Sequence, residues 1–165
     1  MRTAVEGLSL RFADAADVPL ILALIRELAD YERLSHEVVA TEALLHETLF
    51  GTRPVAEVIV ASYGGEPAGF ALYFHNYSTF LGRPGIYLED LFVRPYLRGK
   101  GIGRALLVCL AQIARQRGCG RLEWSVLDWN EPAIRFYESL GAKALNEWTM
   151  YRMTGAALGR LADEA

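Results

Sequence analysis

The segment Arg98–Gly103, with the sequence RGKGIG, has the residue types and spacing most suited to chemistry in this chain. Its three glycines stand at alternate positions, so they leave backbone N–H groups uncovered and allow positive φ angles. The following residues, 104–116, repeat apolar side chains at helical spacing, so the glycines directly precede a helix. Unpaired donors and the helix dipole stabilise a phosphate at a helix N-terminus. The sequence therefore predicts a site for a phosphate-bearing cofactor.

Two familiar nucleotide-binding motifs do not fit this loop. A Walker loop requires Gly-Lys followed by Ser or Thr, whereas Lys100 is followed by Gly101. The dinucleotide fingerprint requires G-x-G-x-x-G directly after a strand, but here the spacing is G-x-G-x-G and Pro95 intervenes. Both nucleotide readings are therefore set aside. A glycine-rich loop by itself is also compatible with a tight connection between a strand and a helix.

Apolar periodicity predicts the elements that position this loop. Strands are predicted at residues 8–12, 57–63, 68–74, 86–93, 122–127, 142–145 and 148–153, and a loop at 76–85. Helices are predicted at about 14–31, 41–50, 104–117 and 130–140, followed by a small Ala/Gly-rich tail. Asp14 and Asp17 have the spacing of a capping box at the first helix. This order of elements implies a mixed sheet with helices on both faces.

Composition limits the classes of function. A chain of 165 residues, 52% apolar and 22% charged, fits a single globular domain over 1–165. The net charge of −3 gives no general attraction to nucleic acid or to an anionic membrane. The two cysteines and three histidines share no ligand spacing, so no metal site is predicted. No apolar run approaches the roughly 20 residues that span a bilayer, and we expect a cytoplasmic protein.

Three segments together resemble a known family. Residues 87–93 (YLEDLFV), 96–103 (YLRGKGIG) and 129–137 (WNEPAIRFY) are similar to the acetyl-CoA signature and neighbouring motifs of the GNAT superfamily of N-acetyltransferases. They most resemble the diamine acetyltransferase branch, which includes the spermidine/spermine and thialysine enzymes. The likeness covers nearly the whole chain. It implies an α/β (α+β) fold with a mixed, mostly antiparallel sheet of six or seven strands, about four helices, and a splay between the fourth and fifth strands.

The resemblance implies acetyl-CoA as the cofactor. Backbone N–H groups of the glycine loop would bind the pyrophosphate, and the exposed backbone of the splayed strand would pair with the pantetheine arm and stabilise an oxyanion. The start of the helix at 130 would bind the same arm. The implied cofactor-binding residues are Leu91, Phe92, Val93, Arg98, Gly99, Lys100, Gly101, Ile102, Gly103, Arg104, Asn130, Glu131, Pro132, Ala133 and Tyr137.

The resemblance also implies the residues that handle protons and substrate. Tyr137 matches the position that protonates the leaving thiolate, and a phenol of pKa about 10 suits that role. Glu89 would accept the proton of the amine, directly or through water, and Asp90 is the alternative because neighbouring strand residues point to opposite faces. Tyr31 and Glu32 match substrate-contacting positions. No serine lies in a nucleophile-elbow motif, so we expect direct transfer.

The predicted substrate is a primary amine of a small molecule, either a diamine or polyamine or a thialysine-like amino acid. Ser78 stands where the spermidine/spermine enzymes have an acidic residue, which favours a shorter amine or a thialysine-like amino acid. Acetylation of a protein N-terminus or lysine is an alternative. A regulatory module that binds CoA without catalysis is another, although such a module would need neither Tyr137 nor Glu89. The resemblance also implies a homodimer, with no nucleic-acid or membrane partner.

Overall fold

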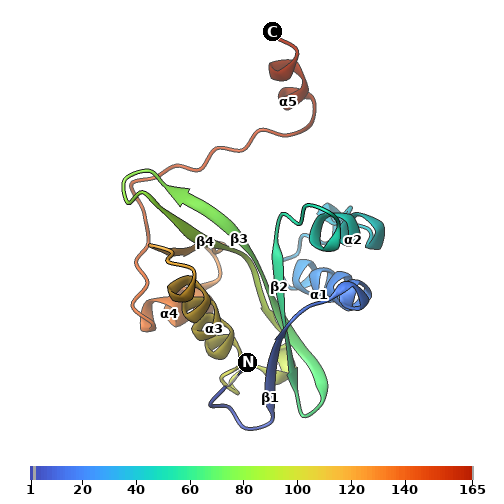
Figure 1. Cartoon of the computed structure of the whole chain (residues 1–165), viewed down its shortest axis with the longest axis vertical. Helices are drawn as coiled ribbons and strands as arrows, with labels where there is room; N and C mark the ends of the chain where they lie inside the picture. Colours follow the sequence, from blue (N-terminus) through green and yellow to red (C-terminus); the bar gives the residue numbers. More distant parts are fainter. Residues whose placement is uncertain (2, 165) are drawn as a thin grey trace. The chain divides into compact units, whose positions relative to one another are not determined.

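The computed structural model describes Met1 and residues 3–164 (Figure 1). The chain forms two compact units, Met1–Ser125 and Val126–Ala165. The first unit contains the whole β-sheet and the glycine loop, and the second contains the motif that begins at Asn130. The expectation of a single domain over residues 1–165 stays a prediction.

The sheet is mixed and mostly antiparallel, as predicted. Its strands, in the spatial order in which they pair, are β1 (Leu8–Phe12), β2 (Glu57–Tyr63), β3 (Glu66–Ser78), β4 (Arg83–Val93) and β5 (Leu122–Trp124). The first four strands pair antiparallel, and β5 joins β4 in parallel. The described residues therefore form a sheet of five strands rather than six or seven.

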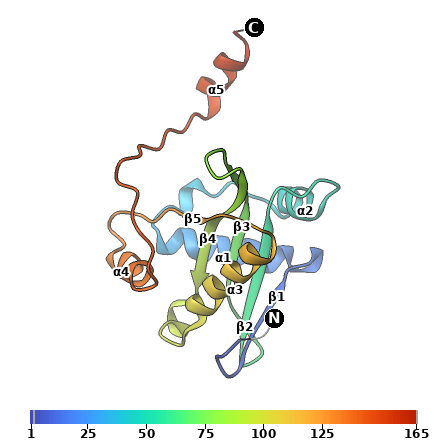
Figure 2. The same ribbon diagram turned by 60° about the vertical axis from the view of Figure 1, so that its left-hand side comes forward.

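Helices cover both faces of the sheet in the first unit (Figure 2). The α-helices are α1 (Val18–Tyr31), α2 (Glu42–Phe50), α3 (Ile102–Gln116), α4 (Glu131–Ser139) and α5 (Gly155–Ala162), and the short 3-10 turns are Ala15–Asp17, Ser35–Glu37 and Pro95–Leu97. Helices α1 and α2 pack on one face, and α3 packs on the other. The prediction of about four helices missed α5. Within the described part of the chain, no helix is both long enough and apolar enough to cross a membrane.

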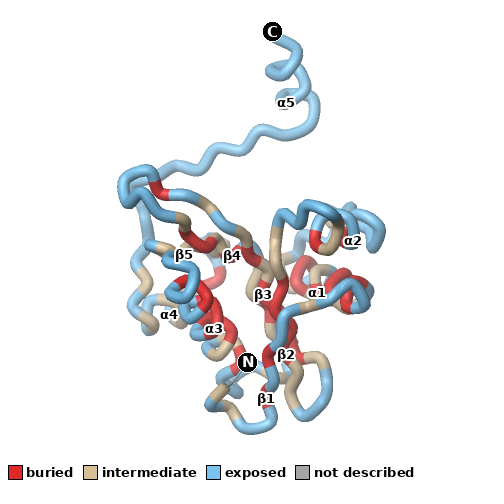
Figure 3. The backbone as a smooth tube through the Cα atoms, in the orientation of Figure 1, coloured by how far each residue is buried: buried red, intermediate tan, exposed pale blue. Residues whose placement is uncertain are grey.

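Two apolar layers hold the sheet between these helices (Figure 3). On one face, Ile21 and Leu24 of α1 pack in a cluster with Phe70 of β3 and Phe92 of β4. On the other face, α3 contributes apolar side chains such as Leu106, which is fully buried. Each such side chain contributes about 1.5–3 kcal/mol when it leaves water. Strands β3 and β4 lie between the two layers and are therefore held from both sides.

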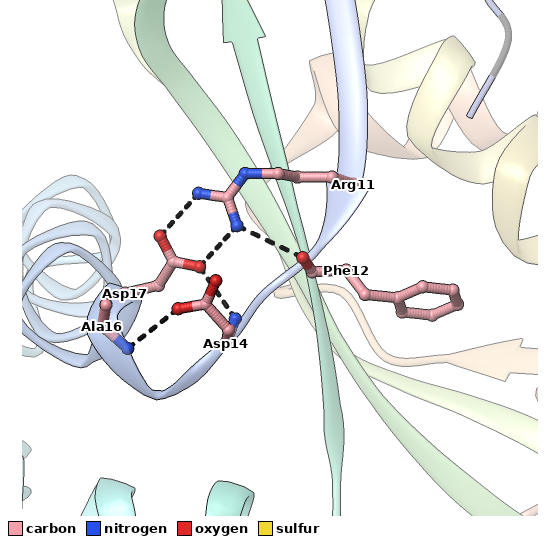
Figure 4. Close-up of polar contacts among 5 residues, drawn as sticks. All are labelled: Arg11, Phe12, Asp14, Ala16 and Asp17. Carbon is pink, nitrogen blue, oxygen red and sulfur yellow. Dashed lines mark hydrogen bonds and ion pairs between the residues drawn. The ribbon is translucent and has the colours of Figure 1, made fainter.

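The start of α1 is fixed by a carboxylate network that the sequence predicts (Figure 4). Asp14 accepts from the backbone N–H of Ala16 at 2.9 Å, and Asp17 accepts from the backbone N–H of Asp14 at 2.8 Å. Both halves of the capping box are thus present, around the short turn that leads into α1. The Arg11 guanidinium also donates two hydrogen bonds of 2.6 Å to Asp17, which lowers the pKa of that carboxyl.

Two predicted strands are absent. Residues 142–145 and 148–153 have apolar and polar side chains in strand-like order, but they form coil in the second unit. Nearly all of them are exposed, and none is part of a sheet ladder among the described residues. A strand is stable only when a neighbour satisfies its backbone groups, so alternation without a partner does not produce one.

The prediction of a loop at residues 76–85 is also wrong, because most of these residues form strands. Strand β3 continues to Ser78 and β4 begins at Arg83, so only a short turn separates them. The antiparallel ladder continues to the pair Ser78 and Arg83, and Pro84 pairs with Tyr77. The ladder overrides the local preference of Asn, Gly and Pro for turns, because strand formation depends on the partner as well as on propensity. Conversely, the strand predicted to reach Leu127 ends at Trp124.

Helix α1 ends with a left-handed residue that is not a glycine. Arg33 has φ 63°, and the Leu34 N–H donates to the Ala29 carbonyl at 2.8 Å while the Arg33 N–H donates to the Asp30 carbonyl at 3.0 Å. This is the hydrogen-bond pattern of a Schellman C-cap, where glycine is usual because a Cβ is strained at positive φ. The strained cap directly follows Glu32, one of the predicted substrate residues.

We expect Arg33→Gly to be about 1 kcal/mol more stable than Arg33→Ala, because only glycine adopts the left-handed conformation without a steric penalty. Both variants remove the same charge, so each is the control for the other. Urea unfolding followed by circular dichroism would measure the difference. Equal stabilities would show that Arg33 is not strained.

Candidate functional site

Strand β4 contains a β-bulge at one of the predicted catalytic residues. Leu72 and Tyr73 are neighbours on β3, but they pair with Asp90 and Leu88, so Glu89 is the extra residue. A bulge of this kind locally disrupts the ladder and redirects the side chains that follow. A pair of adjacent acidic residues in an otherwise apolar strand is the signal in the sequence that could have revealed it.

The bulge changes the face on which the later residues of β4 lie. Leu88 pairs with Tyr73, whose ring lies 6.0 Å from the guanidinium of Arg117, just beyond α3. Four residues later Phe92 is in the core beneath α1 and α2. Asp90 pairs with Leu72, which packs against that same core. The side chain of Asp90 is therefore on the α1 face of the sheet, where regular alternation from Leu88 would have placed it on the α3 face.

Asp90 shares this region with two other carboxyl groups. Burial, together with the nearby charges of Glu89 and Glu32, raises the pKa of Asp90 to about 7. Burial also raises the pKa of Glu32, at the C-terminal end of α1. Glu89 itself is exposed. The charges of Glu89 and Glu32 act on Asp90, so the three carboxyl groups predicted to meet the amine lie near one another.

Among the described residues, one edge of β4 has no strand partner beyond the bulge. Strand β5 pairs only with Ile86–Leu88, in agreement with the predicted splay between the fourth and fifth strands. The Arg94 N–H donates to the Ala68 carbonyl of the β3 side at 2.9 Å. Along an antiparallel ladder, the N–H and C=O groups of successive residues point to opposite edges of the strand. The N–H and C=O groups of Leu91 and Val93 therefore point away from β3. Phe92 directs its backbone to β3, and its ring is in the core.

The glycine loop adopts the conformation that its sequence predicts. Gly99 has φ 78° and Gly101 has φ 81°, both in the left-handed region. Gly101 is the N-cap of α3 and provides no side-chain acceptor, so the first N–H groups of the helix, at Ile102, Gly103 and Arg104, are not satisfied by a side-chain cap. Such donors suit an anion such as pyrophosphate. Lys100 lies beside the loop, with its Nζ 5.3 Å from the centre of the Tyr63 ring.

A bidentate ion pair that the sequence analysis missed ties α1 to the end of β4. The Arg94 guanidinium donates to the two carboxylate oxygens of Glu27 at 2.7 and 3.0 Å and to the Pro67 carbonyl at 2.9 Å. The pair is partly buried, so it is worth more than a surface ion pair. Its partners are 67 residues apart in the chain, and no local pattern links them.

Arg98, a predicted cofactor residue, is also engaged with α1. Its guanidinium carbon lies 4.1 Å from the centre of the Tyr31 ring, and its Nε donates to the Val93 carbonyl at 3.1 Å. Tyr31 is the last residue of α1 and precedes Glu32. The end of α1 and the start of the glycine loop are therefore in direct contact.

The remaining predicted site residues belong to the second unit. Asn130 is buried and caps α4, because its side chain accepts from the Ala133 N–H at 3.4 Å. Glu131 and Pro132 are in the first turn, as predicted. Tyr137 is half-buried on α4, with its ring centre 5.4 Å from that of Phe136.

Ser78 was the residue from which the sequence analysis favoured a shorter amine over a polyamine, and in the structure it makes a structural contact. It is buried, and its hydroxyl accepts from the Leu81 N–H at 3.2 Å in the turn between β3 and β4. It lies at the opposite end of β3 from Gly69, which pairs with Val93. The absence of an acidic residue at this position does not by itself reveal that Ser78 stabilises the turn.

Comparison with known proteins identifies relatives along most of the chain. The model of the acetyltransferase (GNAT) family matches residues 22–142. The thialysine N-epsilon-acetyltransferase of Bos taurus is 43% identical, and the match covers 93% of this chain and 96% of that protein. The L-ornithine N5-acetyltransferase of Arabidopsis thaliana is 37% identical over 90% of this chain and 85% of that protein. An integron cassette protein from the mobile metagenome of V. cholerae superposes with a TM-score of 0.80 at 30% identity, covering 95% of this chain and 98% of that one.

The raised pKa of Asp90 predicts a pH-dependent effect of Asp90→Asn on stability. The pKa of Asp90 is about 7 in the folded protein, against an ordinary value of 3.8 for an aspartate in an unfolded chain. Between these values the folded protein holds a proton that the unfolded chain releases, so folding becomes less favourable as pH rises. Asparagine lacks this titration. The stability of Asp90→Asn relative to the unsubstituted protein should therefore rise, on the order of 2 kcal/mol, between about pH 4 and pH 8.

Denaturant unfolding at a series of pH values would measure this difference. The exposed Asp128→Asn is the control, and its difference from the unsubstituted protein should stay nearly constant. A constant difference for Asp90→Asn as well would show that burial does not perturb Asp90.

Proposed function

Because the chain belongs to the acetyltransferase (GNAT) family, we propose that it transfers an acetyl group from acetyl-CoA directly to a primary amine of a small molecule. The relatives that match nearly its whole length acetylate such amines, as their names state. The observation that carries the substrate class is the grouping of Glu32, Glu89 and Asp90 beside the free edge of β4. Three carboxyl groups suit a cationic ammonium group better than a neutral or anionic acceptor.

The described residues fit acetyl-CoA, which supplies the acetyl thioester when bound. The N–H groups at the start of α3 would hold the pyrophosphate, with Lys100 and Arg104 adding positive charge. The outward backbone groups of Leu91 and the outward N–H of Val93, whose carbonyl accepts from Arg98, would pair with the pantetheine arm, and an N–H there would stabilise negative charge on the acetyl oxygen. Asn130 and the first turn of α4 are proposed to bind the same arm.

The carboxyl groups prepare the amine for attack. An alkylammonium ion has no lone pair, so it must lose a proton before its nitrogen forms a bond to the acetyl carbon. A base with a pKa near the working pH is the most effective acceptor. Asp90, with a pKa of about 7, fits this requirement, and Glu89 is the alternative acceptor, directly or through water. Tyr137 is proposed to give its hydroxyl proton to the sulfur as the carbon–sulfur bond breaks.

Within this class we propose an amino acid that carries a side-chain primary amine as the substrate. The two relatives named above act on thialysine and L-ornithine, which share this feature. The homodimeric assembly stays a prediction; exposed apolar side chains in the second unit are compatible with it, namely Trp148, Met150, Tyr151 and Met153.

A CoA-release assay with purified protein would test the function. We expect acetyl-CoA to be turned over with thialysine, L-ornithine or L-lysine, with kcat/KM about tenfold above that for spermidine, because the two relatives named above act on amino acids with a side-chain amine. The control omits the amine, and release should then be negligible. No amine-dependent release with any of these compounds would contradict the proposed substrate class.

Tyr137→Phe should separate catalysis from binding. Removing the hydroxyl should lower turnover about a hundredfold, because the leaving sulfur loses its proton donor, while CoA affinity measured by calorimetry should change little. Tyr151→Phe, an exposed tyrosine of the same unit, is the matched control and should retain full turnover. Equal turnover by both variants would remove the proton-donor role from Tyr137.

A further inference from the structure

Arg98 is part of the glycine loop, and its side chain, although exposed, contacts two aromatic rings and one backbone carbonyl. Its guanidinium carbon is 4.1 Å from the Tyr31 ring centre and 6.0 Å from that of Phe92. Its Nε donates to the Val93 carbonyl at 3.1 Å. A guanidinium held over an aromatic face and bonded to a carbonyl is restrained in both position and orientation.

These contacts join three segments with different tasks in the proposed function. Val93 is the last residue of β4, at the edge proposed to receive the pantetheine arm. Tyr31 ends α1 and is followed by Glu32, whose charge helps to raise the pKa of Asp90. Arg98 itself follows the short turn Pro95–Leu97 and precedes the first left-handed glycine. A single side chain therefore connects the cofactor loop with Tyr31, the last residue of α1 and the neighbour of Glu32.

Arg98 is not needed as a phosphate ligand on charge grounds. Lys100 and Arg104 are exposed at the same loop, and the helix N-terminus supplies backbone donors. Lys100 approaches Tyr63, on a different part of the sheet, and makes no described contact with α1. Of the loop's charged side chains, Arg98 is the one with described contacts to α1.

We propose that Arg98 is a positioning residue that couples the cofactor loop to the amine site by holding Tyr31, and hence Glu32, against the end of β4. This inference rests on the proposed function. If Arg98 positions the amine site, its replacement should impair use of the amine with every acyl donor. If Arg98 binds phosphate, its replacement should impair activity only with acyl donors that carry phosphate. Lysine keeps the charge but lacks the planar face and the fixed donor at Nε, so Arg98→Lys isolates the positioning role.

The test compares two acyl donors, acetyl-CoA and S-acetylpantetheine, which lacks the pyrophosphate and the nucleotide. Arg98→Lys should lower kcat/KM for the amine about tenfold with either donor, because the stacking and the carbonyl hydrogen bond are lost in both cases. The exposed Arg115→Ala, in the last turn of α3, is the control and should change neither value. A loss confined to acetyl-CoA, with full activity toward S-acetylpantetheine, would identify Arg98 as a phosphate ligand and overturn the proposal.

A thermodynamic cycle on Arg98 and Tyr31 gives a readout that does not depend on turnover. Tyr31→Leu removes the ring, and its effect on the urea midpoint should be smaller in the Arg98→Lys background than in the unsubstituted protein. Additive effects would show that the two side chains do not interact and would contradict the proposal. Failure of the proposed function would look different, since the unsubstituted protein would then transfer no acetyl group from either donor while the cycle still reported coupling.

Discussion

Every backbone group of β4 needs a partner, and only β3 follows this strand along its whole length. Strand β5 pairs with Ile86–Leu88 and then diverges. Beyond that point, one edge of β4 presents N–H and C=O groups to whatever lies beside it, and an unpaired edge readily accepts another extended chain. An extended, amide-containing arm suits this edge. The short pairing with β5 thus leaves this edge of β4 open, and β3 holds the strand in place.

The bulge at Glu89 determines which side chains stand at that edge. One extra residue places Asp90 on the α1 face, among carboxyl groups and partly out of water. The same shift allows Phe92 to enter the core beneath α1. Burying a carboxyl group is unfavourable, and the surrounding structure must compensate for it. The ion pair between Arg94 and Glu27 and the contact between Arg98 and Tyr31 fasten α1 to β4 at this place.

Helix α3 is held at the end remote from the glycine loop. Arg117, just after the helix, donates to both carboxylate oxygens of Glu57 on β2, and Tyr73 of β3 donates to the same carboxylate at 3.2 Å. The hydrogen bonds from Arg117 lower the pKa of Glu57, while burial raises the pKa of Tyr73. With its C-terminal end anchored in this way, α3 presents its uncapped N-terminus in a fixed direction. A fixed array of donors binds an anion more strongly than a mobile one, because less freedom is lost on binding.

The sequence by itself determined the local features of this protein. The left-handed glycines, the capping box at Asp14 and Asp17, and the apolar helices follow from short-range chemistry, and all are present as predicted. The family follows from motifs that are also local. The tertiary structure alone decided the rest: the strand to Ser78, the absence of strands at 142–153, the face of Asp90, and the partners of Arg94 and Arg98. These features depend on pairing between residues far apart in the chain, and no local pattern specifies which residues will meet.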